Sequence, residues 1–138
     1  MLDLLLDSDV VALGGGRPAE SKSATRVLVV DDDASGAYGL ARILRQLGHS
    51  VETAYDGPSA LELARLFRPQ VVFLDLRMPG MHGVELAQLL RAEGLGSHIV
   101  AATAFPAELE RVHAARFDAQ VLKPVEAGSL QKLLAELQ

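Results

Sequence analysis

Short apolar runs alternate with longer amphipathic stretches along the chain from Arg26 onward. Residues 27–30 and 71–74 are apolar throughout, as expected for strands that are buried on both faces of a parallel sheet. The pattern predicts five strands, at 27–30, 51–55, 71–74, 99–102 and 119–122. Apolar residues elsewhere recur at the spacing of an α-helix. They predict helices over 40–47, 57–67, 84–90, 106–115 and 126–137.

The residues that flank these helices are typical of helix ends. Asp33 is a favoured N-cap before the first predicted helix, and Gly48 follows that helix as a natural C-terminal residue. Pro58 lies in the first turn of the second predicted helix. Five strands that alternate with five helices predict a doubly wound, open α/β sheet of parallel strands, because crossovers of this kind are right-handed and join parallel neighbours.

The first 25 residues differ in composition from the rest of the chain. A stretch rich in Gly, Pro and Ser, residues 14–23, follows three leucines at positions 4–6, and such a composition is typical of linkers. We expect residues 1–25 to form a tail or linker and residues 26–138 to form one domain. The acidic residues Asp3, Asp7 and Asp9 argue against an export signal at the N-terminus.

Composition and charge narrow the classes of protein that fit the chain. Hydrophobic residues make up 49% of the 138 residues and aromatic residues only 4%, so the core must be aliphatic. The chain contains no cysteine, which excludes disulfides and thiolate metal sites. A formal net charge of −5 argues against direct nucleic-acid binding, and the apolar runs are too short to span a bilayer. We expect a cytoplasmic domain without membrane insertion.

Polar residues that can carry chemistry lie where the apolar runs stop. Asp31 and Asp32 follow the first predicted strand, and Asp75 follows the third. Thr103 follows the fourth strand and Lys123 follows the fifth. The carboxyl ends of parallel strands share one edge of an open sheet, and ligands bind there where the strand order reverses. The sequence therefore predicts a crevice that contains three carboxylates, a hydroxyl and an ammonium group.

Three carboxylates in one crevice repel each other unless a cation joins them. Oxygen ligands suit Mg²⁺, or Mn²⁺ in its place, and the bound cation would let a carboxylate attack an anionic phosphorus. Lys123 suits the same developing charge, and the Thr103 hydroxyl can donate a hydrogen bond to a phosphoryl oxygen. We therefore expect Asp75 to act as a nucleophile that forms an aspartyl phosphate.

Four motifs resemble those of the response-regulator receiver family of two-component signalling. They are VLVVDDD (27–33), VVFLDLRMPGMHG (71–83), AATAF (101–105) and LKPV (122–125). Each motif is weak alone, and the specificity lies in their joint occurrence, in order, at the ends of four predicted strands. The resemblance covers residues 26–137. It implies a flavodoxin-like sheet with the strand order 2-1-3-4-5.

The resemblance also implies a role for each matching residue. Asp31 and Asp32 would be the acid pair that binds the metal, with Asp75 as the phospho-acceptor. Thr103 would be the switch hydroxyl, and Lys123 would contact the phosphoryl group. The backbone carbonyl of Arg77 would be a further metal ligand. The remaining matches would shape the loops around the site, the last of them after a cis peptide bond: Pro79, Gly80, Gly83 and Pro124.

Some positions depart from the family pattern or bear on it. Gln120 stands where most receivers have an aromatic residue, whose ring follows the switch residue Thr103. Because a Gln side chain cannot fill the same pocket by packing, output would rely on displacement of loops and helices. The Arg77 side chain is expected at the outer face of the phosphoryl group, where its cation would hinder or order the hydrolytic water. His82 replaces a common Asp, and we expect it to lie at the loop surface.

The resemblance implies a signalling function without a separate catalytic domain. The domain would accept a phosphoryl group on Asp75 from a histidine kinase or histidine phosphotransfer protein, assist its own phosphorylation and dephosphorylation, and switch conformation to control a partner. A homodimer is compatible with the sequence. The alternative is a pseudo-receiver, an interaction module that is never phosphorylated, for which Gln120 is the support. Since no output region is recognised after the last predicted helix, we expect either a stand-alone receiver or a module of a hybrid kinase.

Overall fold

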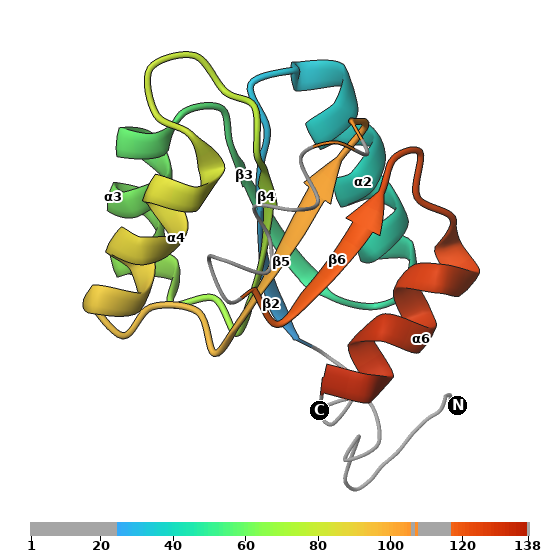
Figure 1. Cartoon of the computed structure of the whole chain (residues 1–138). Helices are drawn as coiled ribbons and strands as arrows, with labels where there is room; N and C mark the ends of the chain where they lie inside the picture. Colours follow the sequence, from blue (N-terminus) through green and yellow to red (C-terminus); the bar gives the residue numbers. More distant parts are fainter. Residues whose placement is uncertain (1–24, 106, 108–116, 138) are drawn as a thin grey trace, which may run out of the picture.

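Five parallel strands form one sheet in the computed structural model, which describes residues 25–105, 107 and 117–137. The strands are β2 (Arg26–Val30), β3 (Ser50–Ala54), β4 (Val71–Asp75), β5 (His98–Thr103) and β6 (Ala119–Leu122) (Figure 1). Their order across the sheet is β3-β2-β4-β5-β6. Numbered along the chain, this is the order 2-1-3-4-5, so the expected fold class is confirmed.

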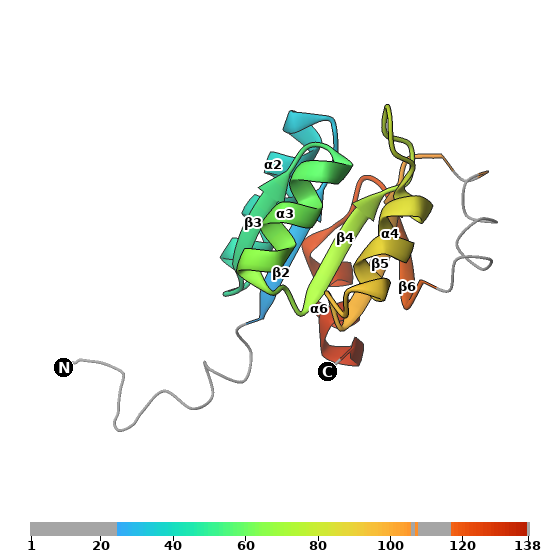
Figure 2. The same ribbon diagram turned by 90° about the vertical axis from the view of Figure 1, so that its left-hand side faces the viewer.

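Helices cover both faces of the sheet. In the described residues these are α2 (Ala34–Gln46), α3 (Gly57–Phe67), α4 (Gly83–Ala92) and α6 (Ala127–Leu137). Helices α3 and α4 lie on one face, and α2 and α6 lie on the other (Figures 1 and 2). The predicted helix over 106–115 falls outside the described residues except at position 107, and nearly all of the expected tail lies outside them too. Thr25, its last residue, already packs on the domain and is 3% exposed.

The sheet carries the core because both of its faces are covered. Leu28 and Val72 point toward α3 and α4, whereas Val29 and Phe73 point toward α2 and α6. Phe73 is the largest fully buried side chain, and the other large ones are Leu, Ile and Val. Each such side chain stabilises the fold by about 1.5–3 kcal/mol relative to an exposed one. The aliphatic core that the composition predicts is therefore present.

Local side-chain contacts fix where the helices begin and end. Asp33 caps α2 and accepts a hydrogen bond from the backbone N–H of Ser35 at 3.2 Å, as predicted. Asp56 caps α3 and accepts one from the N–H of Ser59 at 2.7 Å. After α2, Gly48 takes a φ of +99°, a left-handed conformation that glycine adopts without steric penalty. The caps Asp33 and Asp56 lie at the carboxyl edge of the sheet, whereas Gly48 lies at the opposite edge, before β3 begins.

None of the described helices combines the length and apolar character that crossing a membrane would require.

Candidate functional site

Three carboxyl groups meet at the carboxyl edge of the sheet. Asp31 and Asp32 directly follow β2, and Asp75 ends β4, which neighbours β2. One oxygen of each carboxylate lies within 4.8 Å of the others. Asp31 and Asp75 are buried, whereas Asp32 is exposed. The cluster therefore has two carboxylates inside the fold and a third at its surface.

Lys123 brings a positive charge to this cluster from the end of β6. Its Nζ donates a hydrogen bond to Asp31 Oδ2 at 2.5 Å and lies 3.8 Å from Asp75 Oδ2. The peptide bond between Lys123 and Pro124 is cis, as the resemblance implies. The ion pair joins residues 92 positions apart in the sequence, so it forms only when the sheet is assembled.

Thr103 lies at the same edge, at the end of β5. Its side chain is fully buried, and the register of the sheet places Asp75 beside Ala102, one residue before it. The Thr103 hydroxyl oxygen accepts a hydrogen bond from the backbone N–H of Phe105 at 3.1 Å. The hydroxyl hydrogen can still be donated, because a hydroxyl is both donor and acceptor.

The Asp75 carboxyl group holds its proton more tightly than an ordinary aspartate. Burial raises its pKa to about 6. The Lys123 cation acts against this rise, the Asp31 carboxylate adds to it, and the backbone N–H of Arg77, 3.4 Å from Asp75 Oδ1, lowers the pKa. A divalent cation among the three carboxylates would favour their ionised forms. The oxygen donors present therefore fit Mg²⁺.

Two glycines shape the loop that follows Asp75. Gly80 has a φ of +86°, which other residues adopt only with strain. Gly83 begins α4 against the acceptor strand: a Cβ at this position would lie 2.5 Å from the Asp75 carbonyl oxygen. Its N–H donates to the Leu76 carbonyl oxygen at 3.0 Å. The loop thus allows α4 to start in direct contact with the backbone of Asp75.

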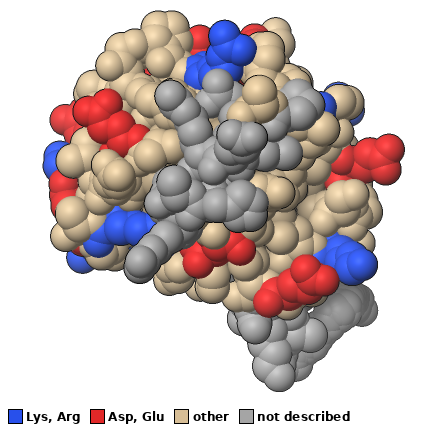
Figure 3. Space-filling view, in the orientation of Figure 1, with Lys and Arg blue, Asp and Glu red and all other residues tan. Residues whose placement is uncertain are grey.

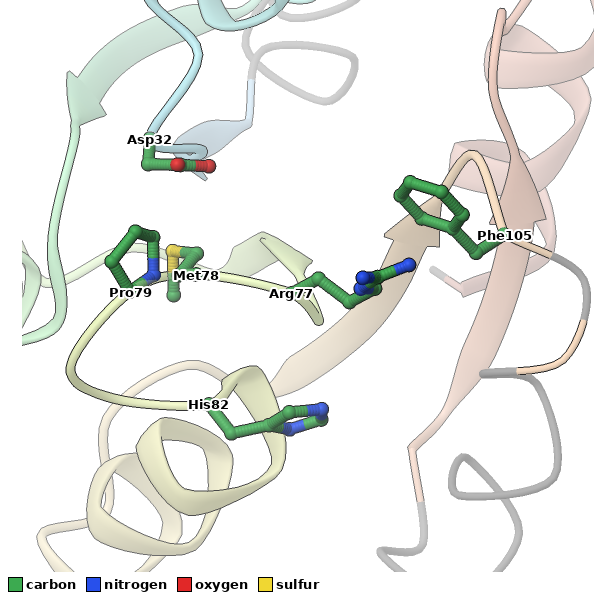
Figure 4. Close-up of a pocket in the computed structure, with 6 residues that line it drawn as sticks. All are labelled: Asp32, Arg77, Met78, Pro79, His82 and Phe105. Carbon is green, nitrogen blue, oxygen red and sulfur yellow. The ribbon is translucent and has the colours of Figure 1, made fainter.

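A pocket of about 500 Å³ opens beside the carboxylates (Figure 4). Its walls come from the first strand end, the loop after Asp75 and the segment after β5, and are formed by Asp32, Arg77, Met78, Pro79, His82 and Phe105. The Arg77 side chain extends toward Phe105, with its guanidinium carbon 4.0 Å from the centre of the ring. This is the geometry of a cation–π contact, and no local sequence pattern predicts it.

Two of the positions that depart from the family pattern have a defined place in the structure. The sequence predicts a loop-surface role for His82, whereas the structure shows a half-buried cap of α4, whose Nδ1 accepts from the Val84 N–H at 3.1 Å. The position of His82 directly before the helix could have indicated a cap. Sequence reasoning missed it because His is not a common N-cap residue. Gln120 lies in β6 opposite Ala101, and its side chain is exposed.

The fold and site together define an α/β domain of the flavodoxin-like class with an acidic, metal-binding type of site at the carboxyl edge of its sheet. A family model described as "Response regulator receiver domain" matches residues 27–135. The chain belongs to this family, and it is a receiver domain of two-component signalling. Domains of this family are not separate enzymes, bind Mg²⁺ in their acidic site and work with histidine kinases or phosphotransfer proteins.

Curated relatives of the chain are response regulators. Response regulator MprA of Mycolicibacterium vanbaalenii is 40% identical over 114 residues, which cover 81% of this chain and 48% of that protein. DNA-binding response regulator MtrA of Mycobacterium tuberculosis is 47% identical over 79 residues, or 57% of this chain and 34% of that protein. The chain therefore matches between a third and a half of the length of these relatives.

Solved structures of receivers share the fold. Chemotaxis protein CheY4 of Vibrio cholerae has a TM-score of 0.76 at 29% identity and covers 83% of this chain and 99% of that chain. The receiver domain of a sensor histidine kinase from Pseudomonas aeruginosa, solved with a magnesium ion coordinated in the active site cleft, has a TM-score of 0.75 at 26% identity. It covers 83% of this chain and 97% of that chain.

Proposed function

We propose that this domain accepts a phosphoryl group on Asp75 and transmits the signal by a change of conformation. The supporting observation is that Asp31, Asp32, Asp75 and Lys123 converge from three separate strand ends, within 4.8 Å for the acids and 3.8 Å for the lysine. An interaction module that takes no phosphate, the pseudo-receiver, has no need for such a cluster. Thr103 at the same edge supports the same function.

In the proposed reaction, a carboxylate oxygen of Asp75 attacks the phosphorus of a phosphohistidine on a histidine kinase or phosphotransfer protein. The new O–P bond forms as the P–N bond breaks, and the electron pair of the broken bond returns to the imidazole. Lys123 offsets charge on the phosphoryl oxygens. Thr103 donates its hydroxyl hydrogen to one of them while its oxygen accepts from Phe105. The domain would in this way assist its own phosphorylation and dephosphorylation.

The metal-binding residues in this proposal are Asp31, Asp32, Asp75 and the backbone carbonyl of Arg77. When bound, Mg²⁺ or Mn²⁺ supplies neutralising charge at the phosphoryl oxygens. Other residues support the site from the loops: Pro79, Gly80 and Gly83 after the acceptor, and Pro124 after the lysine. Thr103 and Gln120 are the proposed switch positions, and the receiver extends over 26–138 after a tail or linker at 1–25.

The distribution of charge on the surface argues against direct nucleic-acid binding by this domain. In Figure 3, Lys and Arg side chains alternate with Asp and Glu side chains over the described residues of this face. The net charge of the chain is −5, and phosphate backbones are bound by clustered positive charge. The relative MtrA is named a DNA-binding response regulator, but the similarity covers about a third of it. We assign DNA binding to no residue of this domain.

Intact-mass measurement after incubation with a small phosphodonor and Mg²⁺ tests the proposed function. We expect wild-type protein to gain one phosphoryl group and Asp75→Asn to gain none. Asp33→Asn is the matched control, because Asp33 caps α2 from the same acidic run and Asn is also a good cap. Its uptake should be retained. No uptake by wild type with any donor, or full uptake by Asp75→Asn, would overturn the proposal.

A further inference from the structure

A second hollow, of about 370 Å³, lies where β3 meets α3 at the outer edge of the sheet. Figure 2 shows β3 and α3 side by side toward the viewer. Tyr55 and Leu66 contribute apolar surface to this β3–α3 groove. Leu66 is 82% exposed and Tyr55 is 49% exposed. One exposed leucine is ordinary, but here two large, exposed apolar side chains line the same groove.

The groove also borders the open backbone edge of β3. The Ser50 N–H and the Ala54 carbonyl oxygen bond toward the β2 side, so the backbone groups of Val51 and Thr53 point outward by the alternation of a strand. The Arg45 side chain of α2 donates to the Val51 carbonyl oxygen at 2.9 Å. Within the described part of the chain, no hydrogen bond covers the outward groups of Thr53, which lines the groove.

The charged side chains that line the groove are acidic. They are Asp56 and Glu62. Asp56 already accepts two hydrogen bonds from Ser59, through the backbone N–H and the hydroxyl. Arg65, one turn from Glu62, makes paired hydrogen bonds of 2.8 and 2.7 Å to Glu93, the residue that caps the C-terminus of α4. The Arg65 charge also acts on Glu62, but its hydrogen bonds go to Glu93, so the Glu62 carboxylate oxygens can still accept hydrogen bonds from a cation outside the domain.

We propose that the β3–α3 groove binds an extended segment of a partner protein that carries alternating apolar residues and a Lys or Arg. The segment would pair with the backbone edge at Thr53, as peptides do when they add to a sheet. Its apolar side chains would pack on Tyr55 and Leu66, and its cation would meet Glu62. The groove thus offers an open strand edge, apolar walls and a carboxylate. These features favour an extended segment that carries both apolar side chains and a basic residue.

Charge complementarity disfavours the two occupants that the chain itself could supply. A second copy has a net charge of −5 and presents the same acidic groove. Residues 1–24 hold four acidic residues against two basic ones: Asp3, Asp7, Asp9 and Glu20 against Arg17 and Lys22. Like charges at an interface lower its affinity. A separate partner with basic residues is therefore the occupant that fits.

The start of α3, next to the groove, contacts the loop after Asp75 (the acceptor loop) through Met81. A Cβ on Gly57, the first residue of α3, would lie 2.3 Å from the Met81 sulfur, so the loop after β4 rests directly on the start of α3. Asp56, the preceding residue, lines the groove. A shift of the loop on phosphorylation of Asp75 would thus move one wall of the groove. This regulatory step rests on the proposed function. It does not require an aromatic residue at position 120, where this chain has Gln.

Binding is tested on the full chain with two synthetic peptides blocked at both ends, Lys-Leu-Thr-Val-Thr-Arg and Glu-Leu-Thr-Val-Thr-Glu. In an amide NMR titration, we expect the basic peptide to shift the signals of Thr53, Glu62 and Leu66 saturably, and to bind about tenfold more tightly than the acidic peptide, as one charge-assisted hydrogen bond allows. Equal binding of both peptides, or no saturable shift at these residues, would overturn the proposal.

A pair of leucine variants checks that the binding occurs in the groove. Leu66→Ser removes an exposed apolar wall and should weaken the basic peptide severalfold without unfolding the domain, because Leu66 is 82% exposed. Leu89→Ser is the matched control on α4, where the leucine is 37% exposed and lies outside the groove. Its affinity should match that of wild type. Equal weakening by both variants would contradict the assigned site.

Coupling to phosphorylation has a separate measurement. We expect the affinity of the basic peptide to differ between unphosphorylated and phosphorylated wild type by about fivefold or more. In Met81→Ala the difference should vanish while intact mass still reports phosphoryl uptake. If wild type takes up the phosphoryl group but binds the basic peptide equally well before and after phosphorylation, the coupling alone would be overturned. Failure of phosphoryl uptake would overturn the proposed function and the coupling, whereas the titration with unphosphorylated protein judges the groove independently.

Discussion

The close contact between the start of α4 and the backbone of Asp75 can be tested by adding a single methyl group at Gly83. A Cβ there would lie 2.5 Å from the Asp75 carbonyl oxygen and 2.8 Å from the Leu76 Cα. Both atoms belong to the backbone of buried residues, so neither can yield as the end of a flexible side chain would. Gly83→Ala must therefore move α4 away from the loop and weaken the 3.0 Å hydrogen bond from Gly83 N–H to the Leu76 carbonyl oxygen.

The expected loss of stability follows from two opposing contributions. Overpacking of a rigid site destabilises by about 1–3 kcal/mol, and contact with backbone atoms places Gly83→Ala near the upper value. The higher helix propensity of Ala offsets at most about 1 kcal/mol of this loss of stability. We therefore expect the free energy of unfolding to fall by about 2 kcal/mol. At a slope of about 1.5 kcal/mol per M of urea, the unfolding midpoint would fall by roughly 1.3 M.

Gly39→Ala provides the matched control for this measurement. Gly39 lies within α2 on its exposed side, and a Cβ there meets no atom within 4 Å. The same substitution should therefore raise the free energy of unfolding by about 1 kcal/mol. Urea unfolding followed by circular dichroism compares the two variants. An unchanged midpoint for Gly83→Ala would refute the argument that the glycine is required by close approach to Asp75.

Three further predictions concern the site and α3. In metal-free protein, burial raises the Asp75 pKa from 3.8 to about 6, so the folded state binds its proton more tightly than the unfolded state and stability falls as the pH rises through this interval. Asp75→Asn should therefore stabilise more at pH 8 than at pH 4 in urea unfolding with a chelator, and a pH-independent difference would contradict this. Arg77→Ala should shorten the lifetime of the phosphorylated state in a time course of intact mass, because the guanidinium held over Phe105 shields the pocket; equal lifetimes would sink this explanation. Phe105→Ala should reproduce part of the change. Asp56→Ala removes the cap bonds to Ser59 and should reduce stability by about 1 kcal/mol in thermal unfolding, whereas Asp56→Asn should retain most of it.

The sequence by itself determined the elements and the candidate chemistry. Residues buried on both faces of a sheet must be apolar throughout, so the apolar runs located the central strands. The helix ends at Asp33 and Gly48 could be predicted because capping depends on residues that are adjacent in the sequence. Asp75, Thr103 and Lys123 stood out because each directly follows an apolar run, and the carboxyl ends of parallel strands share one edge. The order of the strands came from the family resemblance instead.

Local patterns were less informative at the edge of the sheet. The alternation of residues 51–55 predicts a strand that extends to Tyr55. In the structure β3 ends at Ala54, which is buried beside α3, and Tyr55 is exposed. An edge strand is covered unevenly by the two helices beside it, so burial there depends on neighbours from other parts of the chain.

Only the tertiary structure decided which side chains meet. Lys123 reaches Asp31 across 92 residues, and Arg77 stacks on Phe105 from a different strand end. Met81 contacts Gly57, the residue after Asp56 of the β3–α3 groove. The physical reason is that a sequence pattern reports that a residue is buried or polar, whereas its partner is set by the packing of elements that are distant along the chain.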